Sequence, residues 1–325
     1  MTTGTKQSGE GNRAMNDSTV WLAYGLNADG GLVSVLDVIS GRTDLMCPYC
    51  HGLLTAKKGK VKSPHFAHTD ETCDKVRRGK IPTLPMYDRF NLHLSGKEVE
   101  FLQTYWDLYG VHNWAGPWAD MAAKLEKKGF LQANVYRPRG WFEFTKLGKI
   151  PIGALSLNLF SQVQEPMIMK QYDQLAYLAE KNLDDETSQT DFRIYVAQLR
   201  RILAATLYFV EVELDGSTLH KIGVTARNMD ERAREIIRDL APYSSTRVHL
   251  KVLGTWPHRG NIELYFKHRY ARRRVKQLGS LTEYFAFDDL KAVLRDLKRM
   301  PPKGLTPVER QILNADVPTL AEAQL

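Results

Sequence analysis

Alternating apolar and polar positions mark the last third of the chain. Leu207–Glu213 and Leu219–Thr225 predict two strands, and Asp215-Gly-Ser217 between them supplies hairpin-turn chemistry. Asn228 can then cap a helix over Met229–Leu240, with Arg232 in its first turn. We therefore expect a β-hairpin followed directly by a helix.

The following residues complete a small antiparallel sheet flanked by helices. Val248–Leu253 predicts a third strand, and Leu281–Phe287 a strand that closes the sheet. Asn261 is placed to cap a helix that carries Glu263, and Asp288 to cap a final amphipathic helix.

The N-terminal part shows a second β pattern. The segment from Met1 to Ser18 is polar and predicts a disordered arm. Trp21–Gly25 and Leu32–Ile39 flank the turn sequence Asn27–Gly31, which predicts a hairpin. A Pro-containing stretch around residues 82–85 reads as a linker.

The middle of the chain is mainly helical. Helical periodicity and capping signals predict helices at Lys97–Tyr109, Pro117–Lys128, Leu155–Phe160, Pro166–Lys181 and Asp191–Ala205, with a polar loop over Asp184–Thr190. Two short strands, Phe130–Tyr136 and Gly140–Phe144, flank a turn that holds Arg137 and Arg139. This order resembles a winged helix, in which both arginines could reach DNA phosphates. A plain helical scaffold is the alternative.

Charge and composition favour a soluble protein with a polyanionic partner. Lys and Arg number 45 against 37 Asp and Glu, a net charge of +8, which suits DNA, although a basic protein without a nucleic-acid role fits as well. No apolar run reaches the length of a membrane span, and the start lacks a signal core. We expect a cytoplasmic protein with no membrane partner; nothing in the pattern specifies its oligomeric state.

All three cysteines fall within 27 residues, and His65 and His68 lie among them. Cys47-Pro-Tyr-Cys50 precedes His65, His68 and Cys73, and such a set suits tetrahedral zinc. We favour Cys47, Cys50, His68 and Cys73 as ligands, with His65 in reserve. Four protein ligands leave no open position, so the predicted zinc is structural. The alternative is a cluster of reduced, buried thiols.

The segment from Trp21 to Cys73 resembles the N-terminal module of competence protein CoiA-type sequences. The resemblance is carried by "GLVSVLDV", "CPYC", a basic run and "PHFAH". It implies a DNA-associated zinc-binding module. Lys57 and Lys58 in the basic run could contact phosphates, or could form a solvated hairpin tip.

The C-terminal segment resembles the GIY-YIG nuclease superfamily, in the branch whose second motif reads Lys-Ile-Gly. "LYFVEV" stands for the first motif and "HKIGVT" for the second; Arg232, "IELYFKHRY" and "EYF" follow in order. Leu207 stands where a Gly is usual, and Lys221 replaces the second Tyr. The late Asn is not identifiable, so its function is either lost or met by Glu283 or a neighbouring residue. The resemblance implies a metal-dependent phosphodiesterase.

The chemistry of these residues fits phosphodiester hydrolysis. Glu263 would hold a catalytic Mg²⁺ or Mn²⁺, and Arg232 would stabilise charge on the non-bridging oxygens. Tyr208 would position and deprotonate water, with Lys221 either lowering the pKa of that phenol or acting as the base itself. Gly223 would allow a close approach of phosphate.

Several of these residues also have an ordinary structural interpretation. His268 could relay a proton or contact phosphate, but the sequence favours a surface residue over a catalytic one. Glu263 can pair with Lys267 four residues later, and Arg232 with Glu231 or Glu235. Tyr208 could be an ordinary strand aromatic.

Together these features predict a multidomain α+β protein. We expect an arm at 1–18, a β-rich zinc-binding module at 19–80, a helical or winged-helix-like domain at 86–205, a GIY-YIG-like domain at 206–300 and a tail at 301–325. The predicted function is a metal-dependent DNA endonuclease, and the resemblance suggests defence against, or maintenance of, mobile DNA. The alternative is an inactive DNA-binding protein on a nuclease fold.

Overall fold

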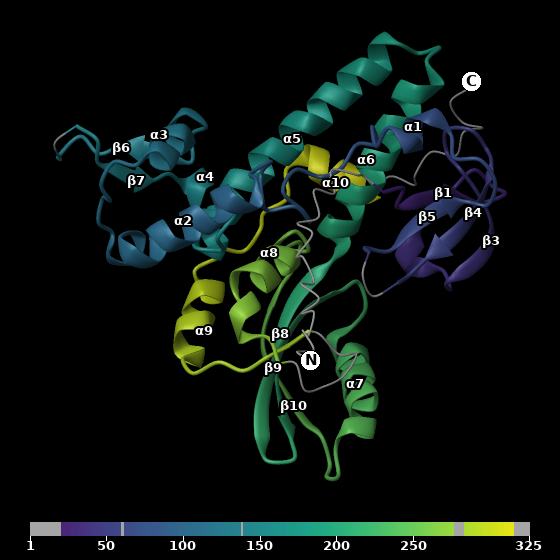
Figure 1. Ribbon diagram of the computed structural model, residues 1–325. Helices are drawn as coiled ribbons and strands as arrows, with labels where there is room; N and C mark the ends of the chain where they lie inside the picture. Colours follow the sequence, from purple (N-terminus) through teal and green to yellow (C-terminus); the bar gives the residue numbers. More distant parts are fainter. Residues whose placement is uncertain (1–20, 60–61, 138, 276–282, 315–325) are drawn as a thin grey trace, which may run out of the picture.

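The computed structural model describes residues 21–59, 62–137, 139–275 and 283–314 (Figure 1). The predicted arm at 1–18 lies outside these residues. The strands are β1 Tyr24–Leu26, β2 Leu32–Ser34, β3 Gly41–Met46, β4 Leu53–Lys57, β5 His65–His68, β6 Leu131–Ala133, β7 Phe142–Phe144, β8 Thr206–Leu214, β9 Ser217–Thr225, β10 His249–Trp256 and β11 Tyr284–Phe285. The α-helices are α1 Asp74–Arg77, α2 Gly96–Leu108, α3 Asp120–Lys127, α4 Lys146–Lys149, α5 Leu157–Lys181, α6 Glu186–Ala204, α7 Met229–Leu240, α8 Ile262–Arg269, α9 Leu290–Lys298 and α10 Pro307–Asn314.

The N-terminal residues form a five-stranded antiparallel sheet in the order β2-β1-β3-β4-β5. The predicted hairpin is confirmed: Asn27 Oδ1 accepts a hydrogen bond from the Gly31 amide at 2.6 Å inside the turn. The sheet buries Leu54 and Phe66 and packs them in one apolar cluster with Ile194 of α6. The N-terminal sheet is therefore anchored to a helix more than a hundred residues further along the chain.

The middle module has the predicted order of helix, helix, strand and strand, and projects to one side of the molecule (Figure 1). A capping box at Ser95 and Glu98 starts α2. The Glu98 carboxylate is 3% exposed and also receives Lys124 at 3.1 Å and Lys128 at 2.6 Å, both from the α3 region. One acid thus caps α2 and ties it to α3.

Helices α5 and α6 form a long antiparallel hairpin, and here the sequence prediction was wrong twice. The two helices predicted at 155–160 and 166–181 are one helix, α5, with Pro166 inside it. The predicted loop over 184–190 is mostly helical, because the Asp185 carboxylate accepts from the Thr187 and Ser188 amides and starts α6 at Glu186.

The C-terminal sheet is antiparallel, in the order β10-β8-β9-β11. Alternate residues of β8 face opposite sides: Leu207 and Phe209 join the apolar cluster with α8 and α9, whereas Tyr208 and Val210 join the cluster with α7. The small antiparallel sheet flanked by helices is therefore confirmed.

Two predicted helix caps in this region were wrong. Asn261 precedes α8, but its side chain does not cap the helix. Its side-chain amide instead donates a hydrogen bond to the side-chain oxygen of Gln164 in α5 at 3.0 Å. The cap of α9 is Asp289 rather than Asp288, since the Asp289 carboxylate accepts from the Ala292 amide at 3.0 Å.

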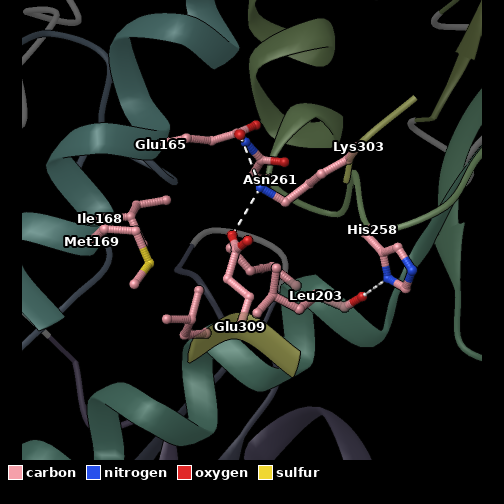
Figure 2. Close-up of a pocket in the computed structure, with 10 residues that line it drawn as sticks. Glu165, Ile168, Met169, Leu203, His258, Asn261, Lys303 and Glu309 are labelled. Carbon is pink, nitrogen blue, oxygen red and sulfur yellow. Dashed lines mark hydrogen bonds and ion pairs between the residues drawn. The ribbon is translucent and has the colours of Figure 1, made fainter. Parts of the chain in front are cut away.

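A buried polar junction joins α5, the loop before α8 and the segment leading into α10 (Figure 2). The Lys303 ammonium lies 2.8 Å from Glu165 and 2.9 Å from Glu309, while Arg259 pairs with Glu165 at 2.5 Å. Burial alone would raise the pKa of Glu165, but the nearby Lys303 holds that pKa below its ordinary value. The cavity here is about 10 Å³, room for roughly one water molecule, so the junction is structural.

Candidate functional site

The four predicted zinc ligands come together in the N-terminal module. One ligand atom from each of Cys47, Cys50, His68 and Cys73 lies within 4.8 Å of the other three. Cys50 Sγ and His68 Nε2 are 3.2 Å apart. Zinc binds sulfur and nitrogen at about 2.0–2.3 Å, so one ion at the centre of the group would come close to bonding distance of all four atoms. These side chains are therefore compatible with structural zinc.

Local backbone structure holds the ligands in place. The Cys47 amide donates to the Gly52 carbonyl at 2.8 Å, and the His51 amide donates to the Cys47 carbonyl at 2.9 Å, which closes a tight turn around Cys50. His51 adopts the left-handed region with φ of 58°. His68 ends β5 and Cys73 precedes α1, so strand and helix boundaries present the other two ligands.

The chemistry of the group is compatible with a bound cation. Burial raises the pKa of the Cys47 thiol to about 12, and the neighbouring thiols of Cys73 and Cys50 add to that effect. Burial also lowers the pKa of His68, whose Nδ1 is a buried atom without a hydrogen-bond partner. A bound zinc ion would displace the Cys47 proton, and the neutral imidazole that burial favours at His68 is the form that binds zinc.

His65, the reserve ligand, lies outside this group. Its Nδ1 is 2.8 Å from the Ser63 carbonyl oxygen, and its ring stacks on Trp21 with centroids 4.3 Å apart. His65 is thus a packing residue of β5, and His68 is the histidine of the metal group.

Tyr208, Gly223 and Arg232 of the predicted catalytic set meet on the α7 face of the C-terminal sheet. Tyr208 and Gly223 are directly opposite in β8 and β9, and the phenol lies across Gly223. Arg232 Nε donates to Tyr208 Oη at 3.2 Å, while its Nη1 pairs with Glu235 at 2.7 Å. The structure therefore brings together three residues from three separate elements.

Lys221 and Glu263 lie at the two ends of a chain of alternating charges. Lys221 Nζ is 2.5 Å from Glu283, Lys267 Nζ is 2.7 Å from the other oxygen of Glu283, and Lys267 also lies 2.9 Å from Glu263. Lys221 is only 5% exposed. Lys267 alone contacts both carboxylates, whereas Lys221 contacts only Glu283. Both carboxylates also act electrostatically on Tyr208, so all these groups share one neighbourhood.

The pKa relations differ from the expectation that Lys221 lowers the pKa of Tyr208. Burial raises the pKa of the Tyr208 phenol above its ordinary value, and the cation that opposes this rise is Arg232. Burial lowers the pKa of Lys221 against the attraction of Glu283, which suits the other predicted role, that of a base.

His268 is placed differently from the other predicted catalytic residues. Its Nε2 is 3.0 Å from the Ile150 carbonyl oxygen, and its ring stacks on Phe90 with centroids 4.8 Å apart. Burial lowers its pKa. These contacts make His268 a partly buried packing residue, rather than a surface residue or a member of the charged chain.

The four basic residues predicted to contact DNA differ in their exposure and hydrogen bonding. Lys57, Arg137 and Arg139 are exposed, whereas the Lys58 ammonium donates to the Leu36 carbonyl at 3.1 Å. The three exposed side chains are accessible to a partner, whereas Lys58 stabilises the turn after β2 through its hydrogen bond.

Sequence reasoning underestimated Lys267 and Glu283, which link the charged chain. Lys267 was weighed only as a surface partner of Glu263, although its side chain is 13% exposed and bridges two acids. The signal that could have found them is the pairing of β9 with β11, which sets Lys221 opposite Tyr284, the residue after Glu283.

Comparison with known proteins gives one match. A family model described as the N-terminal domain of competence protein CoiA matches residues 34–75, the span that contains all four metal-site residues. Neither the curated proteins nor the solved structures gave a match. Within the described residues, no helix is both long enough and apolar enough to cross a membrane. Residues 34–75 are thus similar to a CoiA N-terminal domain.

Proposed function

We propose that the protein is a divalent-metal-dependent DNA endonuclease with a GIY-YIG-like C-terminal domain. The observation that carries the proposal is the contact of Tyr208 with Arg232 beside the charged chain that ends at Glu263. These residues are spread over more than fifty positions, and the family motifs predict this gathering. The zinc module and the middle domain would bind or select DNA.

Each side chain has a role that its surroundings support. The Arg232 guanidinium would donate to the non-bridging oxygens of the scissile phosphate from the position where it now touches Tyr208. The neutral amine of Lys221, which burial favours by lowering the pKa, would accept the proton that Tyr208 passes from water; the ammonium paired with Glu283 must first lose its own proton. Gly223 leaves room for the phenol itself rather than for phosphate, because an added Cβ would lie 2.3 Å from Tyr208 Oη.

Glu263 and Glu283 offer the hard oxygen donors that Mg²⁺ or Mn²⁺ requires. Both acids now contact the Lys267 ammonium, which occupies the position of a cation between them. A bound divalent ion would neutralise the leaving oxygen, and Lys267 would have to withdraw to admit it.

The same lysine supports a second candidate function, that of an inactive DNA-binding protein. Glu263 and Glu283 are already neutralised by Lys267 and Lys221, so the fold does not need a metal ion to balance them. In this case the charged chain would only stabilise the sheet edge.

The test compares the full-length protein with Glu263→Gln on supercoiled plasmid and on circular single-stranded DNA. Mg²⁺ or Mn²⁺ is added or omitted without chelator, so that the predicted zinc is retained. Metal-dependent cutting that falls about a hundredfold or more in Glu263→Gln is expected. Glu231→Gln, which removes an exposed acid from α7, is the matched control and should cut normally.

Two results would contradict the nuclease proposal. The first is DNA binding by the wild-type protein without any cutting, which selects the inactive alternative. The second is equal cutting by wild type and Glu263→Gln, which would assign the activity to other residues or to a contaminant.

A further inference from the structure

The end of the middle module that carries β6 and β7 exposes three large aromatic side chains. Tyr136 is 92% exposed, Trp114 60% and Trp118 59%. The same module buries Tyr105 and Phe142 in its own core, so it has an interior that takes aromatic rings. The exposed rings are not buried in that core. A partner that covered them would bury a large apolar surface.

These rings belong to one end of the module. The Gly116 amide donates to the Phe142 carbonyl at 2.8 Å, and the Phe142 amide donates back to Gly116 at 2.9 Å. The segment with Trp114 and Trp118 on either side of Gly116 therefore runs beside β7. A Cβ on Gly140 would lie 3.1 Å from Trp118 Cβ, so Trp118 lies against the β6–β7 turn that also holds Tyr136.

The charge around the rings is positive. Arg137 and Arg139 lie in the same turn and are exposed, and Arg137 lies over the Trp141 ring, 5.8 Å from its centroid. In the described part of the chain neither guanidinium contacts a carboxylate. Residues 117–149 contain seven Lys and Arg against three Asp and Glu. Two of the seven, Lys124 and Lys128, are balanced by Glu98, and the remaining five still give a small excess that attracts a polyanion.

The acidic group nearest in the hairpin is held by two neutral amide side chains. The Glu143 carboxylate on β7 accepts from the Gln132 amide at 2.6 Å and from the Asn134 amide at 2.7 Å. Both of its oxygens thus accept hydrogen bonds from side chains of the same hairpin. Asp120 in the first turn of α3 is the remaining exposed acid beside Trp118.

We propose that this surface binds unpaired bases of single-stranded DNA. Exposed rings stack on base faces regardless of sequence, and arginines beside them contact the phosphates that join those bases. Bases in a duplex are already stacked on each other and offer no free face, so the rings select single strands, ends or junctions. The inference rests on the proposed function in taking DNA as the partner, but it concerns binding alone.

The experiment measures fluorescence anisotropy of a labelled oligothymidine of about 20 nucleotides, longer than the roughly 4–16 nucleotides that one small binding domain covers. Full-length protein is titrated without Mg²⁺, and a blunt duplex of equal length is measured in parallel. Trp118→Ala and Tyr136→Ala should each weaken binding to the single strand about tenfold, whereas Tyr136→Phe should bind as wild type does. Tyr177→Ala is the control, because Tyr177 on α5 is 59% exposed.

Three outcomes would overturn the inference. These are unchanged single-strand affinity in both alanine variants, an equal loss in Tyr177→Ala, and a wild-type preference for the duplex. If Tyr136→Ala instead abolishes self-association with no change in DNA affinity, the surface binds a second copy of the chain. Cutting assays with Mg²⁺ separate this result from the nuclease proposal: metal-dependent cutting without single-strand binding removes only the present inference.

Discussion

Replacing Gly223 with Ala is the most direct test of how the candidate catalytic residues pack. The added Cβ would lie 2.3 Å from Tyr208 Oη and 2.5 Å from Cζ. Ordinary contacts between such atoms are about 3.5–4.0 Å, so the ring would have to move by more than 1 Å. Tyr208 is fully buried against Val210 and Tyr284, which leaves it little space in which to move.

The expected cost follows from three effects. Overpacking a buried site costs about 1–3 kcal/mol, and displacing the phenol also weakens its hydrogen bond with the Arg232 guanidinium, a bond to a charged group worth about 1.5–3 kcal/mol. Ala in a strand recovers roughly 0.5–1 kcal/mol relative to Gly. We expect a net loss of about 3 kcal/mol, which lowers Tm by about 6–12 °C for a cooperative unit of 150–250 residues.

Thermal melts of the full-length variants measure this loss. Gly96→Ala is the control, because no heavy atom lies within 4 Å of a Cβ added at this first residue of α2. Its Tm should stay the same or rise slightly. In a Tyr208→Ala background the ring is absent, and Gly223→Ala should then cost nothing further.

The reasoning fails if Gly223→Ala melts at the wild-type temperature, since the phenol would then not lie where the structure places it. It also fails if Gly223→Ala lowers Tm equally with and without the Tyr208 ring. In that case the backbone of β9, rather than the ring, would be the source of the loss.

Two further predictions concern the other modules. Cys50→Ser should lower the zinc content measured by elemental analysis from about one ion per chain and lower Tm as well, because a structural zinc site contributes folding energy; unchanged zinc content would refute the site. Hydrogen bonding from Lys128 holds the pKa of Glu98 at about 2, below its ordinary value of 4.5. A depressed carboxyl pKa stabilises the fold above pH 4.5 and loses that effect as the pH falls towards 2. The Tm difference between wild type and Glu98→Gln should therefore be full at pH 7 and shrink across this window, while Glu100→Gln, at an exposed position of α2, should show none.

The features that the sequence predicted well are local ones. The β8–β9 hairpin follows from strict alternation around Asp215-Gly-Ser217, and the metal group from ligands that all lie within 27 residues. Both features depend on residues that are near each other in the sequence. The alternation of a strand repeats every two residues, and a C-x2-C turn takes four.

Other features depended on competition between local and tertiary effects. Pro166 breaks the helical pattern because it lacks an amide hydrogen, yet α5 continues through it with Phe160 and Ile168 buried on either side. Packing of this helix outweighs the lost hydrogen bond. Asp185 carried a cap signal within a polar run that looks like a loop, and composition alone could not separate the two.

The long-range ion pairs could not be predicted from any local pattern. Arg259 and Glu165 are 94 residues apart, and Lys221 and Glu283 are 62 apart. Such pairs are specified only after the sheet order and the helix packing are known. This is also why Lys267 looked like one half of a surface pair.

Helix α6 gives the molecule a stiff internal connection. Near its start Asp191 binds Tyr49 and Lys75 of the zinc module, Arg201 pairs with Asp37, and Ala205 alone separates the helix from β8. Because a single residue joins α6 to β8, the contacts of α6 with the N-terminal module also set the placement of that module relative to the C-terminal sheet. A ligand that touched both sheets would meet them at a nearly constant spacing.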